Sequence, residues 1–196
     1  MMGTIAVDCD RDALIIVDLQ NDFCPGGSLP VPTGHEIIPP INSLLHHNWL
    51  SVATKDWHPA DHCSFKPRGG HWPPHCVQQT SGAELHPELD TTKIKIVITK
   101  GLHPDKEAYS GFQDTDLAKI LRAKGVKRVV LCGLATDYCV RATAHDALHE
   151  GFKVIVLEDA IRGVEVNPGD CQRTIEELRQ AGAQMAVSAN LTFDKP

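Results

Sequence analysis

Four side chains that could do chemistry follow short apolar runs of the sequence. Asp18 comes directly after the run 13–17, and Lys100 comes directly after the run 94–99. Asp56 and Cys139 lie a few residues beyond two further apolar runs. If these runs are parallel strands, their carboxyl ends meet at one edge, where open parallel sheets form their sites. The spacing therefore predicts a site in which carboxylates, an ammonium group and a thiol lie together.

Cys139 is the candidate nucleophile. It lies in the segment GLATDYCV (133–140), between an apolar run and a helical pattern, with Thr136 as the predicted N-cap. The helix dipole and the free N–H groups of a first turn would lower the pKa of the thiol and could hold an oxyanion. A small core thiol that packs the helix on the sheet explains the same position equally well.

Asp18 and Lys100 fit the roles of helpers to that thiol. Asp18 would take the thiol proton and deliver it to a leaving amine, and Lys100 would hold the charges in place. The simpler interpretations are a turn-forming carboxylate, for which Asp22 is the better candidate, and a solvated lysine. A carboxylate, an ammonium group and a thiol at one edge make a workable catalytic triad.

A second group of residues has the types and spacing of a metal site. Asp56 and His58 are two residues apart in an extended segment, so both side chains point the same way. His75, which follows two prolines, is the predicted third ligand. Two imidazoles and a carboxylate suit Zn, Fe or Mn, and open positions filled by water fit a catalytic ion. His62 and His71 are further candidate ligands.

Alternating strand and helix patterns predict how these residues are positioned. The apolar, mostly β-branched runs are 13–17, 51–54, 94–99, 128–132, 153–157 and 184–187. The helical patterns are 35–47, 116–124, 137–149 and 168–181. Near-continuous apolar strands separated by helices predict an α/β fold: a doubly wound, mainly parallel six-stranded sheet with helices on both faces.

One stretch, residues 56–92, departs from this alternation. It is rich in Pro, Gly, His and Trp and has no clear period. A loop this long inside a compact domain is usually functional. We expect it to form the metal-binding region of a single domain that spans residues 1–196.

Composition and charge exclude several classes of function. A formal net charge of −6 over 196 residues disfavours nucleic acid or an anionic membrane as the main partner. No apolar run approaches the roughly 20 residues that span a bilayer, and we expect no secretion signal at the N-terminus. Seven cysteines, an odd number without paired spacings, indicate reduced thiols and a cytoplasmic protein.

Six stretches of the sequence resemble the nicotinamidase branch of the isochorismatase-like cysteine hydrolases. They are VDLQNDF (17–23), DWH (56–58), WPPHC (72–76), TKG (99–101), YSGF (109–112) and GLATDYCV (133–140). The resemblance covers about residues 13–189. It implies a catalytic triad of Asp18, Lys100 and Cys139. It also implies that one divalent metal ion, with Zn expected ahead of Fe or Mn, is bound by Asp56, His58 and His75.

The same resemblance implies the surroundings of the nucleophile. Leu134 and Ala135 would be joined by a cis peptide bond, and the N–H groups of Ala135 and Cys139 would form an oxyanion hole. Some members of the family recruit a fourth metal ligand, for which His62 is the candidate here. The substrate pocket implied by the family contains Phe23, Trp72, Tyr109, Tyr138 and Leu134.

The resemblance implies a reaction as well. Nicotinamide would be deamidated to nicotinate and ammonia through a thioester on Cys139, as a step of NAD salvage. Pyrazinamide is a second candidate substrate. The sequence leaves the oligomeric state open, and a homo-oligomer is compatible with it.

Three other functions compete with this one. An isochorismatase does not need Cys139, and the metal-free carbamoyl and ureido amidohydrolases have no use for the metal ligands. A metal- or redox-sensing protein would use thiolate ligands, and Cys63 and Cys76 lie close to the predicted metal site in the sequence. That interpretation leaves Asp18 and Lys100 without a role.

Overall fold

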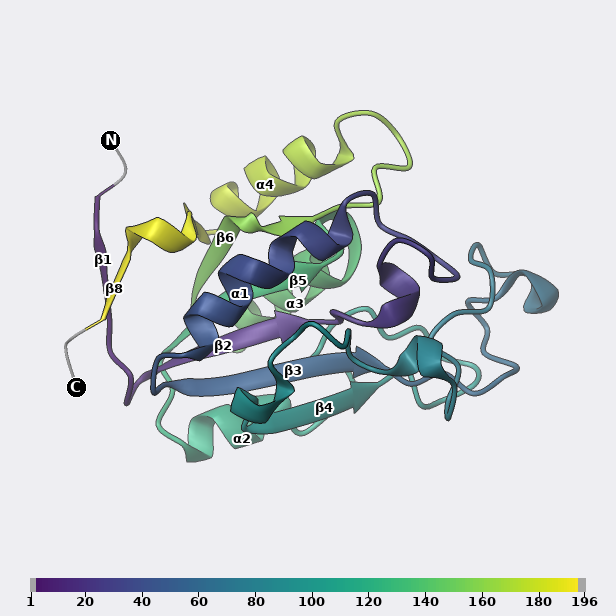
Figure 1. The fold of residues 1–196 in the computed structure, drawn as a ribbon, viewed down its shortest axis with the longest axis horizontal. Coiled ribbons are helices and arrows are strands. Elements are labelled where there is room, and N and C mark those ends of the chain that lie inside the picture. Colours follow the sequence, from purple (N-terminus) through teal and green to yellow (C-terminus); the bar gives the residue numbers. More distant parts are fainter. Residues whose placement is uncertain (1–2, 194–196) are drawn as a thin grey trace.

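Six parallel strands form the central layer of the structure, a computed structural model that describes residues 3–193 (Figure 1). They are β2 (Asp12–Val17), β3 (Leu50–Asp56), β4 (Ile96–Lys100), β5 (Arg128–Leu134), β6 (Lys153–Arg162) and β7 (Gln184–Ala186). Their order across the sheet is β4-β3-β2-β5-β6-β7, and every neighbouring pair is parallel. The predicted α/β fold with a six-stranded sheet is confirmed.

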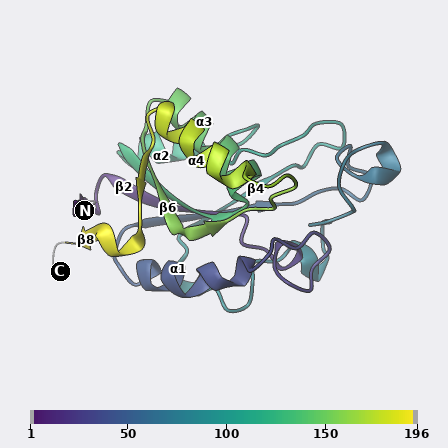
Figure 2. The same ribbon diagram turned by 90° about the horizontal axis from the view of Figure 1, so that it is seen from above.

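Helices cover both faces of this sheet (Figure 2). They are α1 (Ile38–Leu45) on one face, and α2 (Leu117–Ala123), α3 (Arg141–His149) and α4 (Asp170–Gln180) on the other. Leu14 and Ile16 of β2 pack in the core beneath α1, whereas Ile15 and Val17 pack in the opposite core. Because all six residues of β2 are buried, its sequence is an almost uninterrupted apolar run. No helix within residues 3–193 is long and apolar enough to cross a membrane.

The strand order reverses between β2 and β5. From β2 the chain moves outward through β3 to β4 and then returns to β5 on the other side of β2. Sites in open parallel sheets form beyond the carboxyl ends of the strands at such a reversal. Asp18 follows β2 and the turn that bears Cys139 follows β5, so the strand order alone brings these two residues together.

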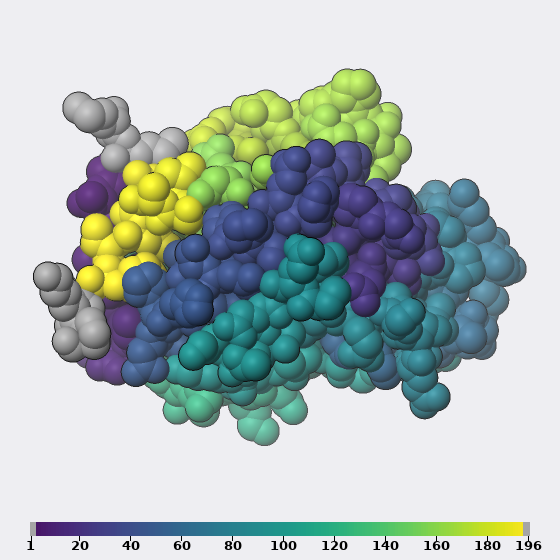
Figure 3. Space-filling model, viewed as in Figure 1, coloured from purple at the N-terminus to yellow at the C-terminus, as the bar shows by residue number. Residues whose placement is uncertain are grey.

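Residues 57–95 connect β3 to β4 without any α-helix. Three short 3-10 helices lie in this connection: Lys66–Arg68, Ser81–Ala83 and Thr91–Lys93. The connection extends beyond the carboxyl ends of the strands, at the right of Figure 1, and returns beside α1 on the face seen in Figure 3. Asn42 of α1 holds the returning chain through hydrogen bonds with Glu88 and Asp90. A bridge between His58 and Val77 brings the chain around residue 75 back toward β3.

Two features of the fold differ from the sequence prediction. The helical pattern over 35–47 forms a 3-10 turn, Gly34–Ile37, followed by α1, because Pro39 and Pro40 are tolerated only in the first turn of a helix. In addition, β1 (Ile5–Val7) and β8 (Leu191–Phe193) form a second, two-stranded parallel sheet. Strands of three residues are too short to produce a recognisable pattern in the sequence.

Candidate active site

Lys100 lies at the centre of the predicted triad. Its Nζ is 2.8 Å from Oδ2 of Asp18, 3.6 Å from Sγ of Cys139 and 3.0 Å from the carbonyl oxygen of Ala108. It also donates a hydrogen bond of 2.5 Å to Oδ1 of Asp56. All of these residues are buried. The structure therefore brings together the three side chains of the predicted triad at the carboxyl ends of three different strands.

One oxygen atom of Asp18 is available to the thiol. Oδ1 accepts a hydrogen bond of 2.6 Å from the hydroxyl of Thr54. Oδ2 forms an ion pair of 2.8 Å with Nζ of Lys100 and has no other polar partner within residues 3–193. A carboxylate oxygen of Asp18 and Sγ of Cys139 lie within 4.8 Å of each other. Asp18 is thus placed to accept the proton of Cys139.

Burial raises the pKa of two members of the triad, Asp18 and Cys139. It raises the pKa of Asp18 above its usual value, although Lys100 opposes it. Burial also raises the pKa of the Cys139 thiol well above its usual value, again against the effect of Lys100. The predicted lowering of the Cys139 pKa is therefore wrong, because the desolvation of a fully buried thiol outweighs the nearby positive charge. At rest Cys139 is a neutral thiol, and its proton must be removed during the reaction.

Lys100 keeps its charge in this buried position. Burial alone would favour the neutral amine, but Asp18 and Asp56 outweigh that effect and raise the pKa of Lys100 well above its usual value. A buried cation between two carboxylates stabilises their ionised forms. Lys100 is thus a fixed positive charge rather than a proton donor.

Cys139 lies in a single π-helical turn, Thr136–Val140, which continues directly into α3. The N-cap position is held by Ala135, not by the predicted Thr136, and no side chain caps the turn. The peptide bond between Leu134 and Ala135 is cis, as the family resemblance implies. The N–H groups of a first helical turn have no acceptor within the helix, so such groups could stabilise an oxyanion beside the thiol.

Asp56, His58 and His75 form a compact group of candidate metal ligands. One donor atom of each lies within 4.8 Å of the other two, and Oδ2 of Asp56 is 3.4 Å from Nε2 of His58. Two ligands about 2.1 Å from a tetrahedral ion are about 3.4 Å apart, so this pair has the spacing of atoms that share one ion. Nδ1 of His58 is 3.1 Å from the carbonyl oxygen of Gly101, and Nδ1 of His75 is 2.8 Å from that of Pro73. These bonds leave both Nε2 atoms for a metal, so the residues present fit a divalent ion.

Two of the three candidate ligands, Asp56 and His75, have the protonation that suits a bound cation. Burial lowers the pKa of His75, which is therefore neutral at neutral pH. Burial alone would raise the pKa of Asp56, but Lys100 and His58 outweigh it and hold the pKa well below the usual range. Burial opposes a charge on His58, yet Asp56 raises the pKa of that imidazole above its usual value. A metal that binds here would displace a proton from His58.

Replacing Gly101 with alanine is expected to weaken metal binding by about 10–100-fold, the usual cost of losing the support of a ligand. Gly101 has a φ of +68°, and a Cβ atom there would lie 2.4 Å from the ring of His58. The control is Gly125→Ala, since Gly125 has a φ of +76° and nothing within 4 Å of an added Cβ. A chelator competition titration measures the zinc affinity of both variants. Equal affinities would contradict the role assigned to Gly101.

Three buried polar side chains that support the site are not evident from the sequence pattern. Gln20 accepts the N–H of Asp56 at 2.7 Å and donates to its carbonyl oxygen at 2.8 Å, which fixes the backbone of that residue. Asp22 accepts the N–H of Ser28 at 3.1 Å, as a turn-forming carboxylate would, and its other oxygen accepts the N–H of Cys76, next to His75, at 2.7 Å. Thr54 orients Asp18. The only signal for the first two is their place in the stretch 17–23.

His62 borders the metal-ligand group without joining it. Its Nδ1 bonds with the hydroxyl of Ser64 at 2.7 Å, and its Nε2 bonds with the carbonyl oxygen of Lys106 at 2.9 Å. The ring centroids of His62 and His58 are 4.1 Å apart. His71, the other additional candidate, is exposed. The structure therefore places neither histidine with Asp56, His58 and His75.

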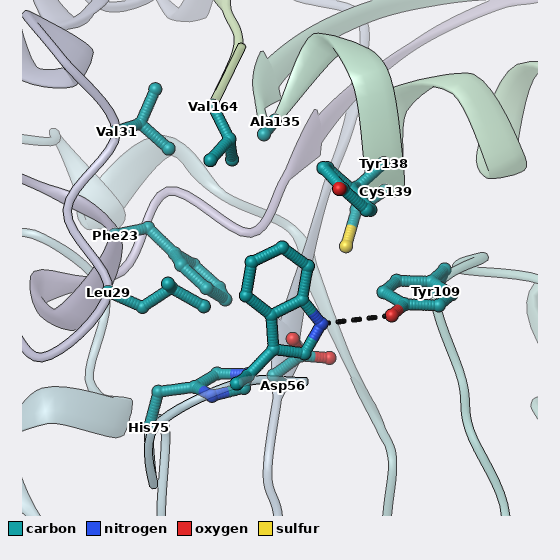
Figure 4. Close-up of a pocket in the computed structure, with 11 residues that line it drawn as sticks. Phe23, Leu29, Val31, Asp56, His75, Tyr109, Ala135, Tyr138, Cys139 and Val164 are labelled. Atoms are coloured by element: carbon teal, nitrogen blue, oxygen red, sulfur yellow. Dashed lines mark hydrogen bonds between the residues drawn. The ribbon is translucent and has the colours of Figure 1, made fainter. Parts of the chain in front are cut away.

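A cavity beside Cys139 contains most of the predicted pocket residues (Figure 4). Its lining includes the aromatic side chains of Phe23, Trp72, Tyr109 and Tyr138. The indole N–H of Trp72 donates a hydrogen bond of 3.0 Å to the hydroxyl of Tyr109, so these two walls are joined. The cavity is therefore shaped for a flat, largely apolar group next to the thiol.

The rest of the cavity lining differs from the predicted pocket: one predicted residue is absent from it, and three further residues belong to it. Leu134 does not line the cavity, because its side chain is fully buried in the core on the α1 side of the sheet. Leu29, Val31 and Val164 line the cavity although the sequence pattern does not single them out. All three lie in irregular segments, where no periodicity indicates the direction of a side chain.

The fold and the site together define an α/β protein whose active edge places a buried thiol beside a group of candidate metal ligands. Residues 12–190 match the isochorismatase domain, and the chain belongs to the isochorismatase family.

Comparison with individual relatives indicates which members of this family the chain resembles. The chain is 44% identical to the nicotinamidase/pyrazinamidase of Mycobacterium tuberculosis over 191 residues, which cover 90% of this chain and 99% of that protein. PnC1 from L. infantum, solved in complex with nicotinate, is 41% identical with a TM-score of 0.93, covering 97% of this chain and 100% of its own. Pyrazinamidase of Pyrococcus horikoshii, solved in complex with zinc, is 52% identical with a TM-score of 0.82, covering 90% and 99%.

Proposed function

We propose that this protein hydrolyses nicotinamide to nicotinate and ammonia. The observation that carries the proposal is the position of Cys139: its thiol is 3.6 Å from Nζ of Lys100 and lines a cavity with aromatic walls that Asp56 and His75 also line. A thiol attacks a carbonyl carbon, aromatic walls suit a flat ring, and a metal suits the lone pair of a ring nitrogen. The nicotinamidase relatives support this choice of substrate. The product would feed NAD salvage.

Asp18 and Cys139 carry out the first half of the reaction. With the ring between Phe23 and Trp72, Asp18 takes the proton from Sγ as the sulfur bonds to the amide carbon. The carbonyl electron pair moves to oxygen, where the N–H groups of Ala135 and Cys139 stabilise it. The C–N bond then breaks, Asp18 gives its proton to the nitrogen, and ammonia leaves.

In the second half of the reaction a water molecule is the nucleophile and Cys139 is the leaving group. Asp18 takes a proton from a water molecule, and the water oxygen bonds to the thioester carbon. The C–S bond breaks, the sulfur of Cys139 regains the proton from Asp18, and nicotinate is released. Lys100 remains charged throughout and stabilises the ionised forms of its two neighbours.

We propose that Asp56, His58 and His75 hold one divalent metal ion, with Zn ahead of Fe and Mn. When bound, the metal supplies a Lewis-acid site for a ring nitrogen, which fixes the ring relative to Cys139. The ligand types, their spacing and the zinc-bound relative from Pyrococcus horikoshii support this assignment. The proposed partners are therefore small aromatic amides, nicotinamide first and pyrazinamide second.

Benzamide is expected to be hydrolysed with a kcat/KM roughly 10²-fold or more below that of nicotinamide, because it lacks the ring nitrogen that the site is built to hold. Pyrazinamide, which keeps a ring nitrogen in the same place, is expected to be a substrate. Ammonia release from each amide by the purified, zinc-loaded protein measures this. Equal rates on benzamide and nicotinamide would contradict the proposed role of the metal, and no ammonia from nicotinamide would refute the function.

Two other functions fit the site less well. The metal-free carbamoyl and ureido amidohydrolases would leave Asp56, His58 and His75 without a purpose. A sensor could use a second group of possible ligands, His62, Cys63 and Glu107, but it is disfavoured because it leaves Asp18 and Lys100 without a role.

Replacing Thr54 with valine is expected to move the acid limb of the kcat/KM profile to higher pH. Asp18 is a base only when ionised, so activity falls as the pH drops through its raised pKa. The Thr54 hydroxyl lowers that pKa, so its loss raises the pKa further. The control is Ser51→Ala, which removes a hydroxyl bonded to Lys93 at the start of the same strand. An acid limb at the wild-type pH in Thr54→Val would contradict the assignment of Asp18 as the base.

A further inference from the structure

One wall of the cavity comes from a loop that carries no residue of the triad or of the metal-ligand group. Val164 lines the cavity and belongs to residues 163–169, between β6 and α4. In Figure 4 it lies with Val31 and Ala135 at the end of the cavity away from Asp56 and His75. The position of this loop therefore decides how large a group the cavity admits at that end.

The carboxylate of Asp137 holds the part of the loop that faces the cavity. Oδ1 of Asp137 accepts a hydrogen bond of 2.9 Å from the N–H of Val164, and Oδ2 accepts one of 2.8 Å from the N–H of Glu165. The exposed fraction of Asp137 is 9%, and hydrogen bonds to a charged acceptor are the stronger kind. The mechanism described above gives Asp137 no role, so these two bonds are what its carboxylate does.

The loop is confined on its other side as well. A Cβ atom at Gly163 would lie 2.0 Å from Sγ of Cys171 and 2.9 Å from Oδ1 of Asp137, so the backbone passes between them with no room for a side chain. Glu165 has a left-handed φ of +53°, and its carboxylate accepts the N–H of Cys171, at the start of α4, at 3.0 Å. The loop is thus anchored between the nucleophile turn and α4.

Asp137 precedes Cys139 by two residues in the same π-helical turn. The same π-helical turn therefore positions Cys139 directly and positions Val164 through Asp137. We propose that Asp137 is a positioning residue that fixes Val164, and that Val164 excludes amides whose ring carries a substituent at that end. This specificity role rests on the proposed function, the hydrolysis of a ring amide by Cys139.

Val164→Ala is expected to raise the ratio of kcat/KM for 5-methylnicotinamide to kcat/KM for nicotinamide by about 10-fold, because one methyl group against a pocket wall is worth roughly 10–200-fold. The probe carries its methyl group on carbon 5, which is next to neither the ring nitrogen nor the carbon that bears the carboxamide. The methyl group therefore leaves both of those positions unhindered. The control is Val166→Ala in the same loop, since Val166 is 57% exposed and does not line the cavity. An unchanged ratio in Val164→Ala would overturn the role of Val164.

Asp137→Asn is expected to raise the same ratio and to increase KM for nicotinamide more than it lowers kcat. Asparagine keeps the shape but places an NH2 group opposite one of the two N–H donors. A role limited to holding the turn would lower kcat for both amides equally and leave the ratio unchanged. In the double variant with Val164→Ala, the ratio is expected to equal that of Val164→Ala alone, because both changes act through one contact.

Hydrogen exchange distinguishes a failure of this proposal from a failure of the proposed function. Without any substrate, the amides of Val164 and Glu165 are expected to exchange faster in Asp137→Asn than in the wild type, since one loses its acceptor and the other keeps only a neutral amide oxygen. Unchanged exchange would overturn the positioning role of Asp137. Faster exchange in a protein that releases no ammonia from nicotinamide would support the positioning role and refute the hydrolysis, and with it the specificity role of Val164.

Discussion

Replacing Cys139 with alanine is expected to lower the turnover of nicotinamide by about 10⁴-fold or more, because the covalent intermediate forms on that sulfur. The fold and the bound metal are expected to stay, since the lost group is small and Cys139 does not belong to the group of Asp56, His58 and His75. Ammonia release and zinc content, measured on the same preparation, check both expectations.

Cys132→Ala is the matched control. Cys132 is likewise buried, but its Sγ points at the carbonyl oxygen of Ile15, 3.6 Å away in the neighbouring strand, and does not line the cavity. This variant is expected to lose some stability and keep its turnover. If Cys139→Ala turned over nicotinamide as fast as Cys132→Ala, another group would have to be the nucleophile.

Asp18→Asn is expected to slow acylation by roughly 10²–10⁴-fold, the usual contribution of a positioned acid or base. The amide keeps the shape of the carboxylate and can still accept the hydrogen bond from Thr54, but it cannot take the thiol proton. Zinc content is expected to be unchanged, because Asp18 is not among the candidate ligands. Single-turnover kinetics and metal analysis test these two expectations separately.

Asp56→Asn is the contrasting variant and is expected to lose the metal. Cys139 should remain open to iodoacetamide in it. Because Asp56 raises the pKa of Asp18, the pKa of Asp18 should also fall when that charge is removed. Loss of zinc from Asp18→Asn, together with metal and activity retained in Asp56→Asn, would refute this division between the two carboxylates.

The outline of the site is predictable from the sequence because the strands are covered on both faces. Such strands are apolar throughout, so a polar residue directly after one of them stands out, as Asp18 does after β2. Lys100 ends the edge strand β4, in which Val97 is 49% exposed, and it stands out because the residues before it are mainly β-branched. The parallel order of the strands then brings those residues to one edge. The spacing of Asp56 and His58 similarly indicates a shared ligand direction, which the 3.4 Å between their donor atoms bears out.

The supporting contacts are not predictable in this way, because they join segments far apart in the sequence. Gln20 contacts Asp56 across 36 residues, and Asp22 contacts Cys76 across 54. The direction of the Cys139 pKa shift depends on how completely the surrounding segments exclude water, which no local pattern records. The loop of Val164 has no periodicity, so its position follows only from contacts with distant residues, such as its hydrogen bonds to Asp137.

The most direct test of nicotinamide hydrolysis at Cys139 is a crystal structure of the zinc-loaded Cys139→Ala variant with nicotinamide bound. The expected result is a ring nitrogen on the ion held by Asp56, His58 and His75, with the carboxamide carbon facing residue 139. The carbonyl oxygen of the carboxamide is expected to point at the N–H groups of residues 135 and 139. A ring nitrogen directed away from the ion, or a carboxamide remote from residue 139, would contradict the proposed function and its mechanism.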